Sequence, residues 1–306
     1  MLALLCPLLQ IDSQFTPPLN IRAKTIAMTL IPSNTLAASA ALLVFAACML
    51  LELIMPRRQA DQGLAWRWCN NFGLGLLTWY LSAGASIHVL ITLTRWTSLN
   101  EVGLLRALNT GPICGFFVFL VCSELLSYWI HRAYHQFSWL WPIHAVHHSD
   151  TNVDVSTSYR HHPFEPILHL PFTASLALIM GIPTEVAVSY RLFDITARVF
   201  SHSNIRIPAI VERYLSYLIL TPDFHRIHHC AEQKFANSNF GSLLPWFDYL
   251  FGTAKKRNFN LHGTIELGLH FLRRPRDTRL DQLLIQPLPV YIEALKSSTT
   301  STGKDN

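Results

Sequence analysis

Charged residues are scarce in this chain of 306 residues. Lys, Arg, Asp and Glu together make up 14% of it, whereas 50% of the residues are hydrophobic. Soluble globular domains carry about 25% charged residues, so this composition argues against a soluble protein. The net charge of +5 is distributed along the chain rather than gathered into one nucleic-acid-binding surface. The composition therefore predicts an integral membrane protein that does not bind nucleic acid.

The sequence also lacks the cysteine patterns of disulfide-stapled and zinc-ribbon domains. Its six cysteines form no CxxC pair and lie mostly in apolar stretches. A disulfide framework is therefore not indicated, and a reducing, cytosol-facing environment is expected. No GxGxxG, flavin-binding or haem-attachment motif is visible. Any redox chemistry is expected to take its electrons from an external donor.

The first residues do not resemble a cleaved secretory signal. MLALLCPLLQ is apolar but lacks a basic segment before it and a cleavage site of small residues after it. We interpret residues 1–34 as an N-terminal extension. Translation from Met28 is one hypothesis, because MTLIPSNTL leads directly into the first convincing apolar segment, and a start at Met1 is the alternative.

Long apolar runs predict membrane-spanning helices. Residues 35–55, 72–94 and 112–130 each approach the length that crosses a hydrocarbon core of about 30 Å. Residues 166–200 are also apolar, but a break at Gly181–Pro183 predicts two helices that turn back on themselves. Tryptophans cluster near the ends of these runs, as interfacial tryptophans do. The expected fold is an all-α integral membrane protein with about four transmembrane helices, including this hairpin, under a cytosolic helical cap.

The domain organisation follows from these runs. Residues 35–111 are expected to hold the first two spans and their connecting loops. Residues 112–253 hold the third span, the hairpin and most of the histidines. Residues 254–306 are expected to form a cytosolic segment, which ends in the disordered polar tail KSSTTSTGKDN. Basic residues after the first span place that side of the membrane in the cytosol.

Histidine is concentrated in one third of the chain. Twelve of the fifteen histidines lie between His131 and His229. HRAYH places two histidines four residues apart, and HAVHH and HRIHH both place three at i, i+3 and i+4. On a helix each of these sets lies on one face. A proline precedes each three-histidine set, which predicts that each set begins a helix, with Thr221 capping the second.

These sets predict metal ligands. Imidazoles packed on one helix face would leave buried polar groups unsatisfied at roughly 1–3 kcal/mol each, and a metal ion removes that cost. A zinc site uses three or four ligands, so the number of histidines implies two metals. Imidazole binds Zn, Cu, Fe and Ni alike, so the spacing alone does not select the metal. The isolated histidines are interpreted as hydrogen-bonded core residues: His88, His169, His262 and His270.

Seven short motifs follow one another in the chain. They are HRAYH from His131, HAVHH from His144, RHHPFE from Arg160, HSN from His202, HRIHH from His225, NFG from Asn239 and WFDYLFGT from Trp246. Together they resemble the membrane fatty acid hydroxylase and sterol desaturase superfamily, from about Glu124 to Thr253. RHHPFE is similar to the family's R-x-H-P-x-E, which selects His162 rather than His161. An obvious cytochrome b5-like domain, such as some fatty acid hydroxylases carry, is absent from the sequence.

The resemblance implies a histidine-ligated pair of metals between the membrane helices and the cap. The implied metals are two irons, with O2 as co-substrate and an external cytochrome b5-like or ferredoxin-like protein as electron donor. The implied ligands are His131, His135, His144, His147, His148, His162, His202, His225, His228 and His229.

Carboxylates are expected to support these ligands, because a metal-bound imidazole usually donates its other N–H to a carboxylate or carbonyl. The candidates are Asp150, Glu165, Asp223 and Asp248. Among them Asp223 and Glu165 are predicted as supporting residues of the catalytic site. Glu124 is a further functional candidate, because it is ionisable and lies in an apolar run.

The predicted function is oxidation of a lipid C–H bond by a membrane-bound di-iron oxygenase. Hydroxylation and desaturation both remain open, as do a sterol, a fatty acyl chain and an ether lipid as substrate. The expected location is the bacterial inner membrane or the endoplasmic reticulum, with the histidines on the cytosolic side. The alternative is a histidine-rich metal transporter or metal-binding membrane protein. Transporters bind their ions near the membrane midplane, whereas these histidines follow the spans, which favours the oxygenase.

Overall fold

The computed structural model describes residues 39–59 and 63–302. Contacts divide the chain into two units, Met1–Leu42 and Leu43–Asn306, and the contacts discussed below lie within the second. The predicted N-terminal extension and the alternative start at Met28 lie outside the described residues. Regular structure in the described ranges is helical, with isolated β-bridges but no strand. This agrees with the predicted all-α architecture.

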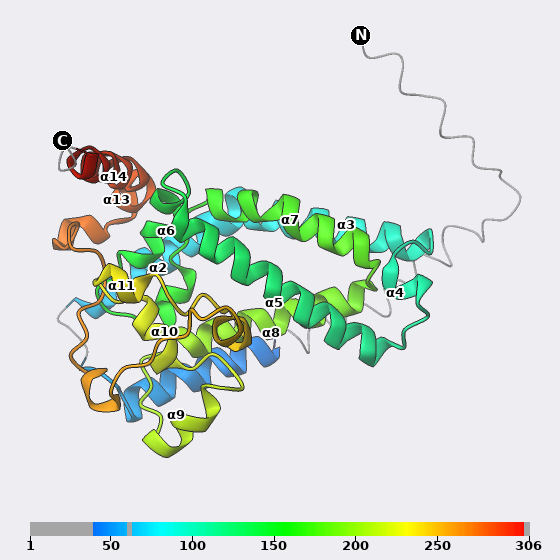
Figure 1. Ribbon diagram of the computed structural model, residues 1–306, viewed down its shortest axis with the longest axis horizontal. Coiled ribbons are helices and arrows are strands. Elements are labelled where there is room, and N and C mark those ends of the chain that lie inside the picture. Colours follow the sequence, from blue (N-terminus) through cyan, green and yellow to red (C-terminus); the bar gives the residue numbers. More distant parts are fainter. Residues whose placement is uncertain (1–38, 60–62, 303–306) are drawn as a thin grey trace, which may run out of the picture. The chain divides into compact units, whose positions relative to one another are not determined.

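The helices have the following bounds along the chain (Figure 1). They are Ser39–Ile54, α2 Leu64–Thr78, α3 Gly84–Leu99, α4 Leu104–Ala107, α5 Pro112–Gln136, α6 Trp141–His148, α7 Phe164–Met180, α8 Thr184–His202, α9 Ala209–Leu215, α10 Pro222–His228, α11 Gln233–Ala236, α12 Trp246–Leu250, α13 Leu280–Ile285 and α14 Pro287–Thr302. A π-helical turn, Trp79–Ala83, joins α2 to α3, and the 3₁₀ turns are Val155–Tyr159, Phe259–Leu261 and Pro275–Thr278. Helix α14 therefore runs into the polar tail.

Two segments are long and apolar enough to cross a membrane, judged by length and composition. They are Leu64–Ala107, which contains α2 and α3, and Ile113–Gln136 in α5. The helices Ser39–Ile54 and Phe164–Met180 are apolar but shorter. The predicted spans 35–55, 72–94 and 112–130 thus each coincide with an apolar helix. Two of these helices in the described residues are long enough to cross a membrane.

The predicted break between α7 and α8 is present in the structure. Gly181 ends α7 in the left-handed conformation, with φ +61°. A Cβ atom at this position would lie 2.1 Å from the carbonyl oxygen of Val102. Both the backbone conformation and the lack of space therefore require glycine here. The close approach fastens the turn of the hairpin to the turn that precedes α4.

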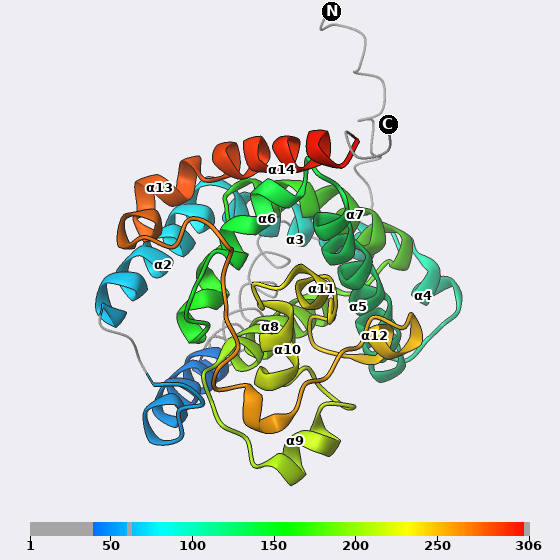
Figure 2. The same cartoon turned by 60° about the vertical axis from the view of Figure 1, so that its left-hand side comes forward.

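The apolar helices carry their histidine-bearing ends toward α6 and α10. Helices α3 and α5 each pack against α7 and α8, α5 also contacts α6, and α8 contacts α10 (Figures 1 and 2). Val146 of α6 packs with Leu74 of α2 and Leu283 of α13. Helix α14 lies along α6 (Figure 2). These contacts stabilise α6, which at eight residues is too short to be stable by itself.

Candidate metal centre

The predicted ligands converge as two groups. The five-histidine group consists of His131, His135, His144, His148 and His228, and the four-histidine group consists of His147, His202, His225 and His229. Within each group, one ligand atom of every imidazole lies within 4.8 Å of the others. The structure therefore brings together all of the predicted ligands except His162.

Helices α6 and α10 each contribute to both groups. His147 and His148 are adjacent in the sequence but belong to different groups. The same is true of His228 and His229. Adjacent residues on a helix point about 100° apart, because a turn contains 3.6 residues. The HxxHH spacing therefore lets one short helix face two centres.

The predicted ligands lie in or near the last turns of their helices. His131 and His135 are near the end of α5, and His202 is the last residue of α8. Helix C-termini carry a partial negative charge, which favours bound cations. The other ligands lie on α6, of eight residues, and on α10, of seven, so the histidine sets also end the helices that they were expected to begin. Thr221 caps α10 as predicted.

The nitrogens that face one another in the four-histidine group are Nε2 atoms. His202 Nε2 lies 3.0 Å from the Nε2 atoms of His147 and His225, and His225 Nε2 lies 3.2 Å from that of His229. His202 Nδ1 donates to the carbonyl of Arg198, at 2.7 Å, so its Nε2 carries a lone pair. Lone pairs at these distances repel one another, whereas nitrogens bound to one metal at about 2.1 Å stand about 3.0–3.4 Å apart. The donor set therefore fits a metal ion.

Burial favours the neutral form of histidines on α6 and at α10, which belong to both groups. Burial, followed by the influence of neighbouring imidazoles, lowers the pKa well below the usual value for His147, His148, His225, His228 and His229. Neutral imidazole is the form that binds metals. One ring nitrogen of each of these histidines is also buried without a hydrogen-bond partner. A metal ion would supply a partner to each nitrogen that faces it.

A loop after α11 holds the outer nitrogens of the five-histidine group. His131 Nδ1 donates to the carbonyl of Phe240 at 2.8 Å. His228 Nδ1 donates to the carbonyl of Ser238 at 2.7 Å. His135 Nδ1 donates to a side-chain amide oxygen of the same loop at 3.3 Å. Because these carbonyl oxygens accept the proton on Nδ1, the Nε2 atoms are left to bind the metal.

Glu165 lies beside the site at the start of α7. Its Oε1 is 3.5 Å from Nδ1 of the ligand His144, and its Oε2 accepts from His161 Nδ1 at 2.8 Å. The ring of His161 stacks on that of His147, with centroids 4.4 Å apart and planes at 12°. Two parallel rings cannot both direct an in-plane lone pair at one metal. His161 is therefore placed as a neighbour of the ligand His147 and not as its partner on the same ion.

Two predicted site residues stand apart from the histidine groups. His162 Nε2 donates instead to the carbonyl of Leu284 in α13, at 3.2 Å. Asp223 forms ion pairs with Arg57, at 3.0 Å, and with Arg226. The structure therefore places His162 at a helix contact and Asp223 in an arginine cluster.

Two other candidate carboxylates act through the loop that holds His131. Asp248 in α12 accepts from the amides of Phe240 and Gly241, both at 2.8 Å. Glu124 in α5 accepts from the amides of two residues further along the loop, at 2.8 and 3.0 Å. Both side chains position the backbone that bonds a ligand.

Asp150 forms a fully buried network behind α6. It accepts from Arg67 and from Thr157, both at 2.8 Å. Burial raises the pKa of Asp150, but Arg67 and Arg160 outweigh burial and bring the pKa below its ordinary value. Arg160 Nε donates to the carbonyl of Val146, at 2.9 Å, near the C-terminal end of α6. The network therefore supports the turn that carries the ligands of α6.

A small cavity lies against both histidine groups. Its volume is about 70 Å³, and the ligands that line it are His131, His144, His147, His202 and His225. A second cavity, of about 290 Å³, lies between α3, α7 and α8. Both cavities are lined by Ser127, His161, Glu165, His169 and Arg198. The second cavity therefore adjoins the first.

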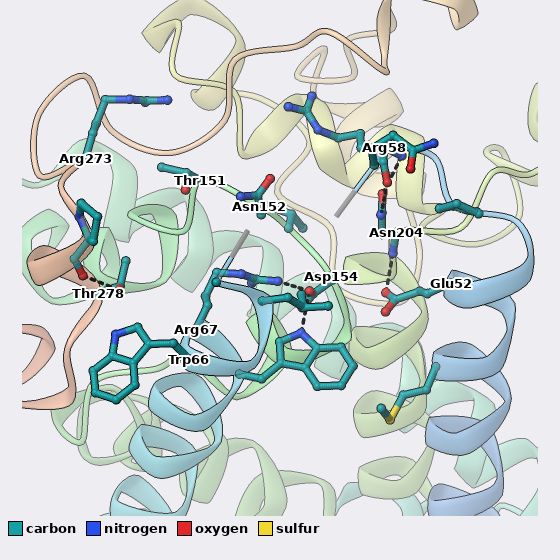
Figure 3. A pocket seen from close by; sticks show the side chains of 18 of the residues that line it. Glu52, Arg58, Trp66, Arg67, Thr151, Asn152, Asp154, Asn204, Arg273 and Thr278 are labelled. Carbon is teal, nitrogen blue, oxygen red and sulfur yellow. Dashed lines mark hydrogen bonds and ion pairs between the residues drawn. The ribbon is translucent and has the colours of Figure 1, made fainter. Parts of the chain in front are cut away.

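A larger cavity, of about 440 Å³, lies away from the histidines (Figure 3). Figure 3 shows Arg67 directed toward Asp154 in its wall. Two of its arginines are bound to backbone carbonyls, since Arg58 donates to that of Ile265 and Arg273 to that of Leu269. Its lining contains no predicted ligand. Predicted ligands therefore line the cavity of about 70 Å³ and not this larger one.

Two parts of the site were not predicted from the sequence. The carbonyls of Ser238 and Phe240 accept hydrogen bonds from His228 and His131. A backbone carbonyl has no sequence signature, and the NFG motif marked the position of the loop without its role. His161 lies at the site in place of its neighbour His162. Consecutive residues of extended chain point to opposite sides, so one of the two was expected inward, and the resemblance to R-x-H-P-x-E had selected His162.

Comparison with known proteins identifies this segment. The model of the fatty acid hydroxylase family matches residues 116–253. Very-long-chain aldehyde decarbonylase GL1-5 of Oryza sativa subsp. indica is 28% identical over 172 residues, which cover 53% of this chain and 25% of that protein. Alkylglycerol monooxygenase of Homo sapiens is 28% identical over 133 residues, covering 43% and 28%. Very-long-chain aldehyde decarbonylase CER1 of Arabidopsis thaliana is 25% identical over 185 residues, covering 56% and 27%.

The matches cover about a quarter of the length of these relatives, and no solved structure matches the chain. The family segment nevertheless contains every histidine of both groups. It also contains the loop and the carboxylates that hold them. Residues 116–253 of this chain therefore match the fatty acid hydroxylase family.

Proposed function

We propose that this chain is a membrane-bound di-iron oxygenase that oxidises a C–H bond of a lipid. The observation that carries the proposal is the convergence of nine histidines on two adjacent centres beside one cavity. A pair of bound irons would supply O2-dependent oxidation of the C–H bond. In hydroxylation, R–H, O2, two electrons and two protons give R–OH and water. Desaturation would begin with the same hydrogen and remove a second one in place of adding oxygen.

The residues of the chain would bind the metals and position the substrate. The five-histidine group and the four-histidine group would each hold one iron. The cavity of about 70 Å³ would receive the reacting carbon next to both. The larger cavity between α3, α7 and α8 would hold part of the apolar chain, and its apolar lining includes Ile87, Leu90, Leu170 and Ile195. These walls would also exclude water from the reaction.

The outward faces of the apolar helices support a membrane location. Large apolar side chains are exposed on α5, at Ile113 and Phe117, and on α7, at Ile167 and Phe172. Apolar exposure of this extent is typical of a surface that contacts lipid or another protein. We propose that the helices near residues 39–54 and the α7–α8 hairpin complete a four-helix membrane portion with the histidines on its cytosolic side. An external cytochrome b5-like or ferredoxin-like protein would supply the electrons.

The relatives narrow the substrates to test. The named activities of the matched proteins concern alkylglycerols and very-long-chain aldehydes. We therefore propose a long-chain lipid as substrate, with an alkylglycerol and a long-chain aldehyde as the first compounds to assay. The transporter alternative has less support, because the ligands lie at helix ends and not midway along the apolar segments.

Metal analysis tests the proposal directly. Untagged protein purified in detergent from iron-replete cells is expected to contain about two irons per chain, because each histidine group offers enough ligands for one ion. Elemental analysis gives the stoichiometry, and oxygen consumption after reduction tests reactivity. Exchangeable zinc or copper at variable stoichiometry, with no iron and no reaction with O2, would contradict the proposal and favour transport or storage.

Filling the larger cavity tests the path of the lipid. Leu170→Trp is expected to lower activity on long-chain substrates at least tenfold while leaving the metal content unchanged, because Leu170 lines this cavity and is not a ligand. The matched control is Ile167→Trp on the same helix, at a position that is 50% exposed. Turnover and metal content are measured for both variants. Equal activity in the two variants would show that the substrate does not occupy this cavity.

A further inference from the structure

The two histidine groups differ in how their outer nitrogens are held. Three members of the five-histidine group donate from Nδ1 to one loop: His131, His135 and His228. In the four-histidine group His202 donates to a backbone carbonyl, whereas the Nδ1 atoms of the other members are buried without a hydrogen-bond partner: His147, His225 and His229. An outer hydrogen bond fixes the tautomer and the ring orientation, and its removal typically weakens metal binding about 10–100-fold.

Asn239 anchors the centre of this loop. It has φ +56°, in the left-handed region that asparagine tolerates better than most residues. Its Nδ2 donates to the carbonyl of Phe224 in α10 at 2.7 Å, and its Oδ1 accepts from the amide of Lys255 at 2.7 Å. The carbonyls on either side of it, those of Ser238 and Phe240, both accept from ligands. Asn239 thus holds two acceptors against one metal group.

Asp248 anchors the end of the loop. In addition to the two loop amides, its carboxylate accepts from Thr253 Oγ1 at 2.7 Å. A Cβ atom on Gly241 would lie 2.6 Å from the carbonyl oxygen of Leu244, so the backbone is packed too closely for any side chain. The loop is therefore a supported element and not a free connection.

We infer that the five-histidine group binds its metal more tightly than the four-histidine group, with Asn239 and Asp248 as positioning residues for the tighter site. The inference rests on the proposed function, because it requires both groups to bind metal. The five-histidine group has one more ligand, and three of its ligands are oriented before the metal arrives. The four-histidine group must orient most of its rings on binding. Its ion is therefore the one that leaves first.

Titration of metal-free, full-length protein with Co²⁺ in detergent tests the inference. We expect two steps in the visible absorbance, with dissociation constants at least about tenfold apart. Asn239→Gly keeps the left-handed conformation accessible but removes the three side-chain hydrogen bonds of Asn239. It is expected to weaken the tighter step about 10–100-fold and to leave the weaker step unchanged. Two steps of equal affinity, or equal weakening of both steps, would overturn the inference.

Three further variants separate binding from folding. Asn237→Ala removes the bond to His135 from an exposed side chain, and it is expected to weaken the tighter step less than Asn239→Gly. If Asn239→Gly does not fold, a normal tighter step in Asn237→Ala overturns the inference. His225→Ala should abolish the weaker step and retain the tighter one. Asn260→Ala, at an exposed position of another loop, should change neither step.

The same titration separates this inference from the proposed function. If Co²⁺ binds in two steps of equal affinity, the inference fails and the di-iron proposal stands. If neither Co²⁺ nor Fe²⁺ binds to the folded protein, both fail together.

Discussion

Replacing His147 or His228 with alanine is expected to abolish activity and to remove one of the two metals in each case. His147 belongs to the four-histidine group and His228 to the five-histidine group. Loss of a bound ion removes several kcal/mol of transition-state stabilisation, so turnover should fall at least about 1,000-fold. The measurements are turnover and metal content per chain. Membrane insertion should be unchanged, because both side chains lie outside the apolar segments.

His270→Ala serves as the control for these two variants. His270 is exposed, contrary to its interpretation from the sequence as a core residue, and it belongs to neither metal group. Its replacement should leave metal content and turnover at the wild-type level. A variant of His147 or His228 that retains both metals and full activity would refute the ligand assignment.

Replacing Asp150 with alanine is expected to produce the largest loss of stability among single substitutions near the site. Asp150 is 0% exposed and pairs with Arg67, which is also buried. Removing one partner of a buried ion pair typically costs about 3–5 kcal/mol. For a domain of comparable size each kcal/mol lowers the melting temperature by about 2–4 °C, so a decrease of about 10 °C is expected. Thermal unfolding in detergent, followed by circular dichroism, measures it.

Asp281→Ala is the matched control, because Asp281 also pairs with an arginine, Arg279, but both side chains are 56% exposed. Exposed ion pairs contribute little, so the melting temperature should not change measurably. Asp150→Ala is also expected to lower metal affinity, since the network holds the end of α6 through Arg160. A change below 2 °C in Asp150→Ala would show that Arg67 finds sufficient compensation from its second partner, Asp154.

Much of the secondary structure near the site follows from local signals in the sequence. Proline at the start of α6 and α10, the cap at Thr221 and the break at Gly181 each set a helix boundary that the structure contains. Such signals act over a few residues, so they can be read from the chain directly. The extent of the membrane portion is different. It depends on how shorter apolar helices pack together, and local composition does not determine that packing.

The convergence of the histidines was largely predictable because helical spacing places the histidines of one box on a common side. The division into two groups was not predicted. It depends on the angle between α6 and α10, which tertiary packing decides. The exchange of His162 for His161 at the site has a similar origin, since a hydrogen bond to Leu284 in α13 holds His162 elsewhere. The carbonyls of the supporting loop belong to the backbone, and no residue type reveals them.

The division of adjacent histidines between the groups has a geometric consequence. In α6 and in α10, one backbone carries histidines of both groups, so the separation of two bound ions would be set by the pitch and radius of a helix. Neither ion would be able to shift far from the other unless a helix unwinds or rotates as a whole. Two short helices would thus constrain the same distance between the two metal positions. Inserting one residue inside either HxxHH set would move its last two histidines by about 100° around the axis and mismatch both centres at once.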